Sequence, residues 1–241
     1  MSTQAVMMSL MLCGGFASCG NDDEDDSIDT KPISLYAGSE KDIQGADSIQ
    51  SSNKFVAYGK GNVVHAFHVG ETTLLVNGKK TISISVLPQY HLYDDPVCNW
   101  GCDIDYVKKN QKQGTFSNKS TDELIVYENA GAASVLAYKF KNNKLEAVMA
   151  VVSTNHSSEY ASFLSERYLM LPYYEGADTY FVGADNLELT SANTVVMLQV
   201  YSATQLHTIY VPAKNYSTRS VQDMKDMEKK VESFVEKLRN I

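Results

Sequence analysis

The chain has 241 residues (26.7 kDa), and 44% of them are hydrophobic, which is ordinary for a folded protein with a buried core. Its net charge is -8, but the acidic run 22–26 (DDEDD) contributes five of these charges, so the rest of the chain is close to neutral. Because the sequence has no Lys/Arg-rich run and no nucleic-acid-binding motif, it lacks the charge needed to bind a phosphate backbone. We therefore expect no nucleic-acid partner.

The N-terminal residues read as an export signal. Residues 5–18 (AVMMSLMLCGGFAS) form an apolar run of signal-peptide length, shorter than the roughly 20 residues that a membrane-spanning helix needs. The small pair Ala17-Ser18 before Cys19 resembles the lipobox of bacterial lipoproteins, although residues 1–4 (MSTQ) lack the usual positive charge. The resemblance implies that a signal peptide, 1–18, is removed and that Cys19 is acylated. An ordinary secretory signal is the alternative.

The segment that follows, 19–30, is rich in like charge and poor in apolar side chains, so we expect an extended tether. An acidic run directly after a lipidated cysteine also resembles the export signal of surface lipoproteins in one group of Gram-negative bacteria. The resemblance implies an outer-membrane protein, anchored in the membrane by its N-terminal lipid and facing the cell exterior. A plain linker on a periplasmic protein is the alternative.

Residues 31–88 predict a small, all-β sandwich. Period-two alternation indicates strands at 55–58, 63–67, 72–76 and 81–86, separated by turns rich in Gly and Asn. The pattern resembles the group 2 bacterial immunoglobulin-like domains, and it is carried by Ser52, Asn53, Val56, Ala57, Val64, Ala66, Gly70, Thr72 and Thr73. The resemblance implies a trimmed Ig-like β-sandwich over this segment.

Residues 89–241 predict a separate α+β domain. Asp103 is the expected N-cap of a helix that carries Ile104 and Val107 on one face and stops before Gly114. Strands at 123–127, 135–140 and 145–152 follow, the last two joined by an Asn142-Asn143 turn. We expect Trp100, which precedes the helix, to fill the core there.

The same order then repeats. A second helix is expected, with Ser157 or Ser158 as its N-cap and Pro172 closing it, and with an apolar face formed by Tyr160, Phe163, Leu164, Tyr168 and Leu171. Strands at 179–182, 194–201 and 207–211 follow it. The repetition predicts duplicated helix-then-strands halves on one antiparallel sheet, an architecture similar to the saddle of TATA-box-binding proteins without its basic face.

The last segment, 216–241, predicts a C-terminal amphipathic helix. Its apolar side chains recur at spacings of three and four: Met224, Met227, Val231, Phe234, Leu238 and Ile241. We expect this helix to pack on the sheet of its own domain. Self-association through the apolar stripe is the alternative, although the stripe is shorter than the three to four heptads typical of a coiled coil.

No catalytic motif is present, and we expect no catalytic residues, metal site or cofactor. His65 and His68 are three residues apart on a predicted strand, so their side chains would project from opposite faces and could not chelate one ion. We expect both to be isolated histidines at the surface or half-buried. Cys98 and Cys102 are the cysteines left in the mature body if Cys19 is acylated, and we expect either a disulfide across a turn or two inert thiols.

Two further sets of residues are candidate sites. The chain has 15 tyrosines, and the adjacent Tyr173 and Tyr174 cannot both face a core, so either could contact a ligand. The triplets that contain Ser27 and Ser48 (Asp-Ser-Ile in both) resemble the sites at which some Gram-negative bacteria attach O-glycans to exported proteins. Structural roles for the tyrosines and chance for the triplets are the alternatives.

These features predict a lipid-anchored envelope protein that is not an enzyme. We expect a noncatalytic surface module that binds a glycan, a peptide or a partner protein, because an anchor and a spacer are present and a catalytic constellation is not. A structural or assembly component of an envelope complex is the second hypothesis. An enzyme of unrecognised type is the third, and it would require a pocket with converging carboxylates or histidines.

Overall fold

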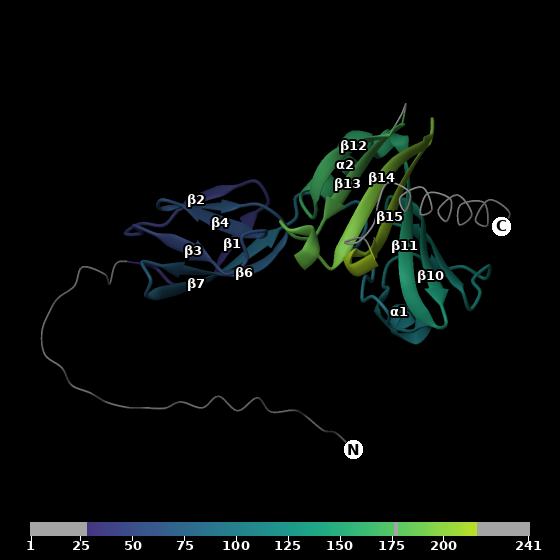
Figure 1. Cartoon of the computed structure of the whole chain (residues 1–241), viewed down its shortest axis with the longest axis horizontal. Helices are drawn as coiled ribbons and strands as arrows, with labels where there is room; N and C mark the ends of the chain where they lie inside the picture. Colours follow the sequence, from purple (N-terminus) through teal and green to yellow (C-terminus); the bar gives the residue numbers. More distant parts are fainter. Residues whose placement is uncertain (1–27, 176–177, 216–241) are drawn as a thin grey trace, which may run out of the picture.

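The computed structural model describes residues 28–175 and 178–215 (Figure 1). The predicted signal peptide, Cys19, the acidic run, Ser27 and the predicted C-terminal helix lie outside the described residues. The described chain is mostly β-structure in largely antiparallel sheets, with two short α-helices, which confirms the β-rich fold that the alternating patterns predict. Neither of these helices has the length and apolar character needed to cross a membrane.

The first unit, residues 28–88, contains two sheets, with strand orders β1-β7-β6-β3 and β2-β5-β4. β1 runs parallel to β7, and the other neighbours are antiparallel. The strands are β1 (Ile33–Tyr36), β2 (Glu40–Asp42), β3 (Ile49–Ser51), β4 (Ala57–Lys60), β5 (Val63–Ala66), β6 (Gly70–Val76) and β7 (Lys80–Leu87).

The predicted strands of this unit correspond to β4, β5, β6 and β7. β6 and β7 match the predicted strands most closely, because alternate side chains along them are buried, among them Leu74, Val76, Ile82 and Ile84. β4 begins two residues later than predicted, since the amides of Val56 and Ala57 donate to the Asn53 carbonyl in a turn. β1, β2 and β3 were not predicted, because each has three or four residues and no buried alternation.

The second unit, residues 89–175 and 178–215, is built on an eight-stranded sheet of order β12-β13-β14-β15-β11-β10-β9-β8. Its elements are α1 (Ile104–Asn110), β8 (Thr115–Phe116), β9 (Leu124–Ala130), β10 (Ala133–Lys141), β11 (Lys144–Ser153), η2 (Thr154–His156), α2 (Ser157–Ser165), β12 (Leu169–Glu175), β13 (Asp178–Ala184), η3 (Leu189–Ser191), β14 (Thr194–Ser202), β15 (Gln205–Pro212) and η4 (Ala213–Asn215).

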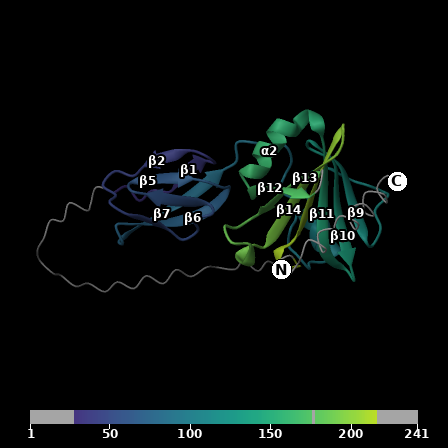
Figure 2. The same ribbon diagram turned by 45° about the horizontal axis from the view of Figure 1, so that its top comes forward.

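Both α-helices pack on one face of this sheet. α1 begins at the predicted N-cap, where the Asp103 carboxylate accepts from the Tyr106 amide at 2.8 Å, and it buries Val107. α2 buries Tyr160, Phe163 and Leu164 against the same core, and Figure 2 shows it beside β12 and β13. The predicted Asn142-Asn143 turn is present, with positive φ at both residues between β10 and β11.

The predicted extent of the second helix is wrong. α2 ends at Ser165, and Leu169–Glu175 form β12, so Leu171 is not on a helical face. Pairing with β13 satisfies the backbone of β12, and Pro172 is tolerated because β12 is the edge of the sheet. The predicted serine caps are also wrong, because His156 is the N-cap and Ser153 caps the preceding η2 by accepting from the Asn155 amide.

The two units are joined by hydrogen bonds to Glu166, the C-cap residue that follows α2. Its carbonyl accepts from the Val69 amide of the first unit at 2.7 Å. Its carboxylate accepts from the backbone amides of Gln89 and Tyr90 in the connecting segment, at 2.9 and 3.1 Å. Arg167 donates to the same carboxylate at 2.6 Å and to Asp95 at 2.7 Å. This group of charges fixes the chain where it passes from one unit to the other.

Replacing Glu166 by Ala is expected to lower the free energy of unfolding of the second unit by about 2–4 kcal/mol. The change leaves two amides without their acceptor and removes one of the two carboxylate partners of a buried guanidinium; the side chains of Glu166 and Arg167 are only 6% and 9% exposed. Urea unfolding followed by the fluorescence of Trp100, the single tryptophan, measures the loss.

The matched control is Glu159→Ala, which removes an exposed carboxylate from the same helix. It is 3.5 Å from His156, and its loss should cost less than about 0.5 kcal/mol. Equal effects of the two substitutions would contradict the role given to Glu166.

Candidate functional site

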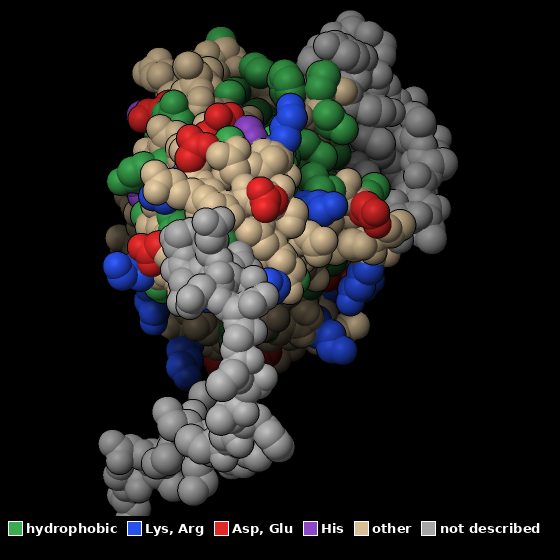
Figure 3. Space-filling view, turned by 90° about the vertical axis from the view of Figure 1, so that its left-hand side faces the viewer, with side chains coloured by type: hydrophobic (Ala, Val, Ile, Leu, Met, Phe, Trp, Pro, Cys, Tyr) green, Lys and Arg blue, Asp and Glu red, His purple; other side chains and the backbone are tan. Residues whose placement is uncertain are grey.

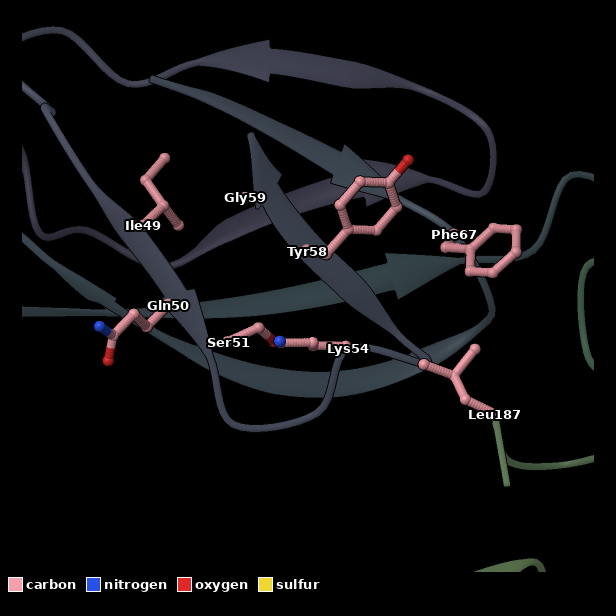
Figure 4. Close-up of a pocket in the computed structure, with 8 residues that line it drawn as sticks. All are labelled: Ile49, Gln50, Ser51, Lys54, Tyr58, Gly59, Phe67 and Leu187. Carbon is pink, nitrogen blue, oxygen red and sulfur yellow. The ribbon is translucent and has the colours of Figure 1, made fainter. Parts of the chain in front are cut away.

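An open cleft of about 560 Å³ lies beside the first unit, between the edge strands β3 and β4 and a loop of the second unit. Its volume falls within the usual range for small-ligand sites, about 300–1,000 Å³. Figure 4 shows its lining, which consists of Ile49, Gln50, Ser51, Lys54, Tyr58, Gly59, Phe67 and Leu187. The cleft therefore combines apolar, hydroxyl, amide and ammonium groups from three separate segments of the chain.

Two aromatic rings form one end of the cleft. Tyr58 and Phe67 are 37% and 38% exposed, and their rings meet edge to face with centroids 6.3 Å apart. The ring of Tyr58 also stacks on His65, which is held by Glu40 at 2.9 Å. Because neighbours fix these rings, they can present flat apolar surfaces to a ligand at little further cost in entropy.

Phe67 rests on a buried aromatic stack. The ring of His68 lies 4.0 Å from that of Phe67 and is parallel to that of Phe55 at 3.9 Å. His68 is 1% exposed, so the expectation of a surface or half-buried histidine is wrong for this residue; it lies beyond β5, in the turn into β6. Its Nδ1 atom is 2.8 Å from the Phe55 carbonyl oxygen. Burial lowers the pKa of His68, and hydrogen bonds to the backbone of Phe55 and Tyr168 act in the opposite direction.

The polar side of the cleft is a corner of the chain built around Thr72. The Thr72 hydroxyl accepts from the Asn53 amide at 3.0 Å and lies 3.1 Å from the hydroxyls of Ser51 and Ser52. Lys54 follows this corner, and its amino group points toward Ser51 (Figure 4). Lys54 is the single charged residue among the described residues that line the cleft.

Two close contacts shape the remaining walls. A Cβ atom on Gly59 would lie 2.4 Å from the Cβ of Ile49, so glycine is what allows β4 to approach β3 there. Leu187, 46% exposed, is in the loop after β13 (Figure 4). That loop is fixed by Asp185, whose carboxylate accepts from the amides of Asn193 and Thr194 at 2.8 and 3.1 Å.

A second, more polar cleft of about 420 Å³ lies at one end of the eight-stranded sheet. It is lined by Asn129, Gly131, Ala132, Ser134, Ser153, His156, Thr204 and Gln205. It lacks an exposed aromatic surface among its described residues, so the first cleft offers the more varied set of contacts to a ligand.

The structure has Cys98 and Cys102 as two thiols. They flank a turn in which the Cys102 amide donates to the Asn99 carbonyl, and Gly101 has a φ of 81°. Burial raises the pKa of both thiols, which makes them poor nucleophiles at neutral pH. The inert-thiol alternative matches this arrangement, and the disulfide stays a prediction.

Trp100 lies in the same turn and packs against the core of the second unit, as predicted. Its indole N–H donates to the Thr194 hydroxyl at 3.2 Å.

The other predicted contacts are elsewhere in the fold. Tyr173 and Tyr174 are on β12, where they pair with Tyr180 and Thr179 of β13, and their side chains lie outside the described part of the chain. Ser48 is exposed, and its backbone is held by Asn77, so a modifying enzyme could reach its hydroxyl. The proposed modification itself remains a prediction.

Tyrosines account for much of the polar core of the second unit. The hydroxyl of Tyr93 lies 2.8 Å from that of Tyr160 and 2.6 Å from that of Tyr210. Tyr160 donates to the Thr208 hydroxyl at 2.7 Å. Burial raises the pKa of all three tyrosines, so these groups stay neutral and act as structural hydrogen bonds.

Residues 28–175 and 178–215 contain no group of three or more His, Cys, Asp or Glu side chains that could hold a metal ion. Figure 3 shows that acidic and basic side chains both lie on the end of the molecule formed by the first unit.

Comparison with protein-family models, with curated proteins and with solved structures gave no match to this chain.

The neutral state of His68 gives a pH dependence that can be measured. Its pKa is lowered in the folded protein, while the unfolded chain titrates at about 6.5. Its contribution to stability is therefore fully present above pH 6.5 and is lost as the pH falls through that value, because the unfolded state then binds the extra proton. We expect the NMR titration midpoint of His68 to lie below 6.5 and the melting temperature to fall below that pH. A midpoint at or above 6.5 would be inconsistent with the buried stack.

Proposed function

We propose that this protein is a noncatalytic glycan-binding module, and that the cleft lined by Tyr58, Phe67 and Lys54 is its ligand site. The observation that carries the proposal is the pairing of two fixed, partly exposed aromatic rings with amide, hydroxyl and ammonium groups in one open cleft. The apolar face of a sugar ring can stack on such rings, while its hydroxyls exchange hydrogen bonds with Gln50 and Ser51.

Lys54 adds a preference within this class. As the single charged lining residue described, it provides a positive charge that an acidic sugar could pair with. We therefore expect acidic glycans to bind more tightly than neutral ones. This difference in affinity should become smaller as the salt concentration rises.

A binding role is supported by what the described side chains can do chemically. The buried tyrosines and thiols are neutral at physiological pH, and the cleft brings no carboxylate or histidine into its described lining. A hydrolase would need a general acid and a base or nucleophile facing the bound substrate.

The remaining parts of the chain would anchor the site and hold it away from the membrane. We propose that Cys19 carries the lipid anchor in the outer membrane, that the acidic tether leads out to the cell exterior, and that the first unit is an Ig-like spacer. We also propose that the second unit arose by duplication. The supporting observation is that its two halves meet at β11 and β15, and that each half runs from a helix into four consecutive strands.

Glycan binding can be tested by array screening followed by calorimetry with Tyr58→Ala. We expect the substitution to weaken binding about tenfold or more, because it removes one of the two stacking surfaces. Lys54→Gln should weaken the binding of acidic glycans and change the binding of neutral glycans little. Tyr36→Ala is the matched control, since Tyr36 is an exposed tyrosine on β1 of the same unit and is not part of the cleft lining.

Two results would overturn the proposal. One is a bound glycan whose affinity is unchanged by Tyr58→Ala. The other is an array without any bound glycan, together with peptide binding that Tyr58→Ala abolishes, which would assign the cleft to peptides.

A further inference from the structure

The eight-stranded sheet has a second apolar face, opposite the one that α1 and α2 cover. One side chain from each of seven neighbouring strands stands in register across it. This apolar row consists of Val126, Ala137, Met149, Ile209, Met197, Val182 and Leu171. Cross-strand partners share a face, so the row is continuous from β9 to β12.

Most of this row is buried. Ala137 and Met149 are 0% and 1% exposed, while Leu171 at the end of the row is 59% exposed. A side chain on the surface of a single sheet cannot be that inaccessible unless another layer lies over it.

The described elements do not supply that layer. The cluster around the row is formed by residues of β9, β10, β11, β13, β14 and β15, together with Ala192 and Ala213. The buried side chains of α1 and α2 belong instead to the cluster on the other face.

We infer that the C-terminal segment of the same chain, residues 216–241, docks as an amphipathic helix on the apolar row. The described chain ends at Asn215 in η4, two residues after Ala213, which is itself a member of the cluster. The next residue therefore starts at the edge of the uncovered face. The N-terminal segment outside the described residues is unsuited to this role, because the signal peptide 1–18 is proposed to be removed and residues 20–27 (GNDDEDDS) carry no apolar side chain.

The dimensions and chemistry of the segment fit the face. Its apolar stripe runs from Met224 to Ile241, which is about 26 Å along a helix. The apolar row crosses seven strands, or about 29 Å at the usual strand spacing. The stripe is made of Met, Val, Phe, Leu and Ile, and the opposite side of the helix carries Lys229 and Glu236, so only one face of the helix would be buried.

Methionine oxidation of the purified protein tests this assignment. In the wild type, Met149 and Met197 should resist peroxide, since both lie in the row under the helix. Phe234→Asp places a charge in the middle of the apolar stripe and should release the helix, so both methionines become oxidised. Met170 packs on the opposite face and should stay as protected as in the wild type. Lys229→Asp, on the polar side of the helix, is the matched control and should leave all three methionines unchanged.

Two outcomes overturn the inference. Protection of Met149 and Met197 that survives Phe234→Asp would mean that another segment covers the row. A wild-type dimer by light scattering that Phe234→Asp converts to a monomer would mean that a second copy supplies the covering helix. Oxidation of Met170 as well in Phe234→Asp would mean that the whole unit has loosened. The milder Phe234→Ser variant is then compared in the same way: oxidation of Met149 with Met170 still protected supports the inference, and protection of both contradicts it.

Discussion

The position of the candidate site depends on the Glu166 carboxylate. The carboxylate accepts hydrogen bonds from the amides of Gln89 and Tyr90 and pairs with Arg167. Glu166 is also the C-cap of α2, and its backbone carbonyl accepts from the Val69 amide. One residue thus ties a helix of the second unit, the connecting segment and the first unit together. A buried carboxylate is stable here because charged and backbone donors surround it, and the same need for partners gives the junction a defined geometry.

The cleft is a consequence of that junction. Tyr58, Phe67 and Lys54 belong to the first unit, and Leu187 belongs to a loop of the second, so the shape of the site depends on how the units are held. The rings themselves are fixed locally, by stacking on histidines within the first unit. The site therefore combines a rigid aromatic surface with a wall supplied by a separate unit, which allows both stacking and enclosure of a ligand.

Local chemistry explains which parts of the fold could be predicted from sequence. β6 and β7 alternate buried residues with exposed or half-buried ones. Asp103 caps α1 with its own side-chain carboxylate, and the Asn142-Asn143 turn depends on the positive φ of its own two residues. β12 was predicted as helix because Tyr168 and Leu171 continue the helical spacing, yet pairing with β13 prevails. The cleft could not be predicted, because its lining comes from segments more than 100 residues apart. Aromatic residues at predicted strand positions were the only signal in the sequence, and the adjacent Tyr173 and Tyr174 carried it more clearly than Tyr58 and Phe67.

The most direct test of the account is the distance across the cleft, measured by pulsed electron paramagnetic resonance. Spin labels at Gln50→Cys and Glu188→Cys would stand on exposed positions of the two units, in a Cys98→Ser, Cys102→Ser background. We predict one narrow distance distribution, which broadens when Glu166→Ala is added. A distribution that is already broad with Glu166 present, or one that Glu166→Ala leaves unchanged, would contradict the claim that this carboxylate holds the two units in place.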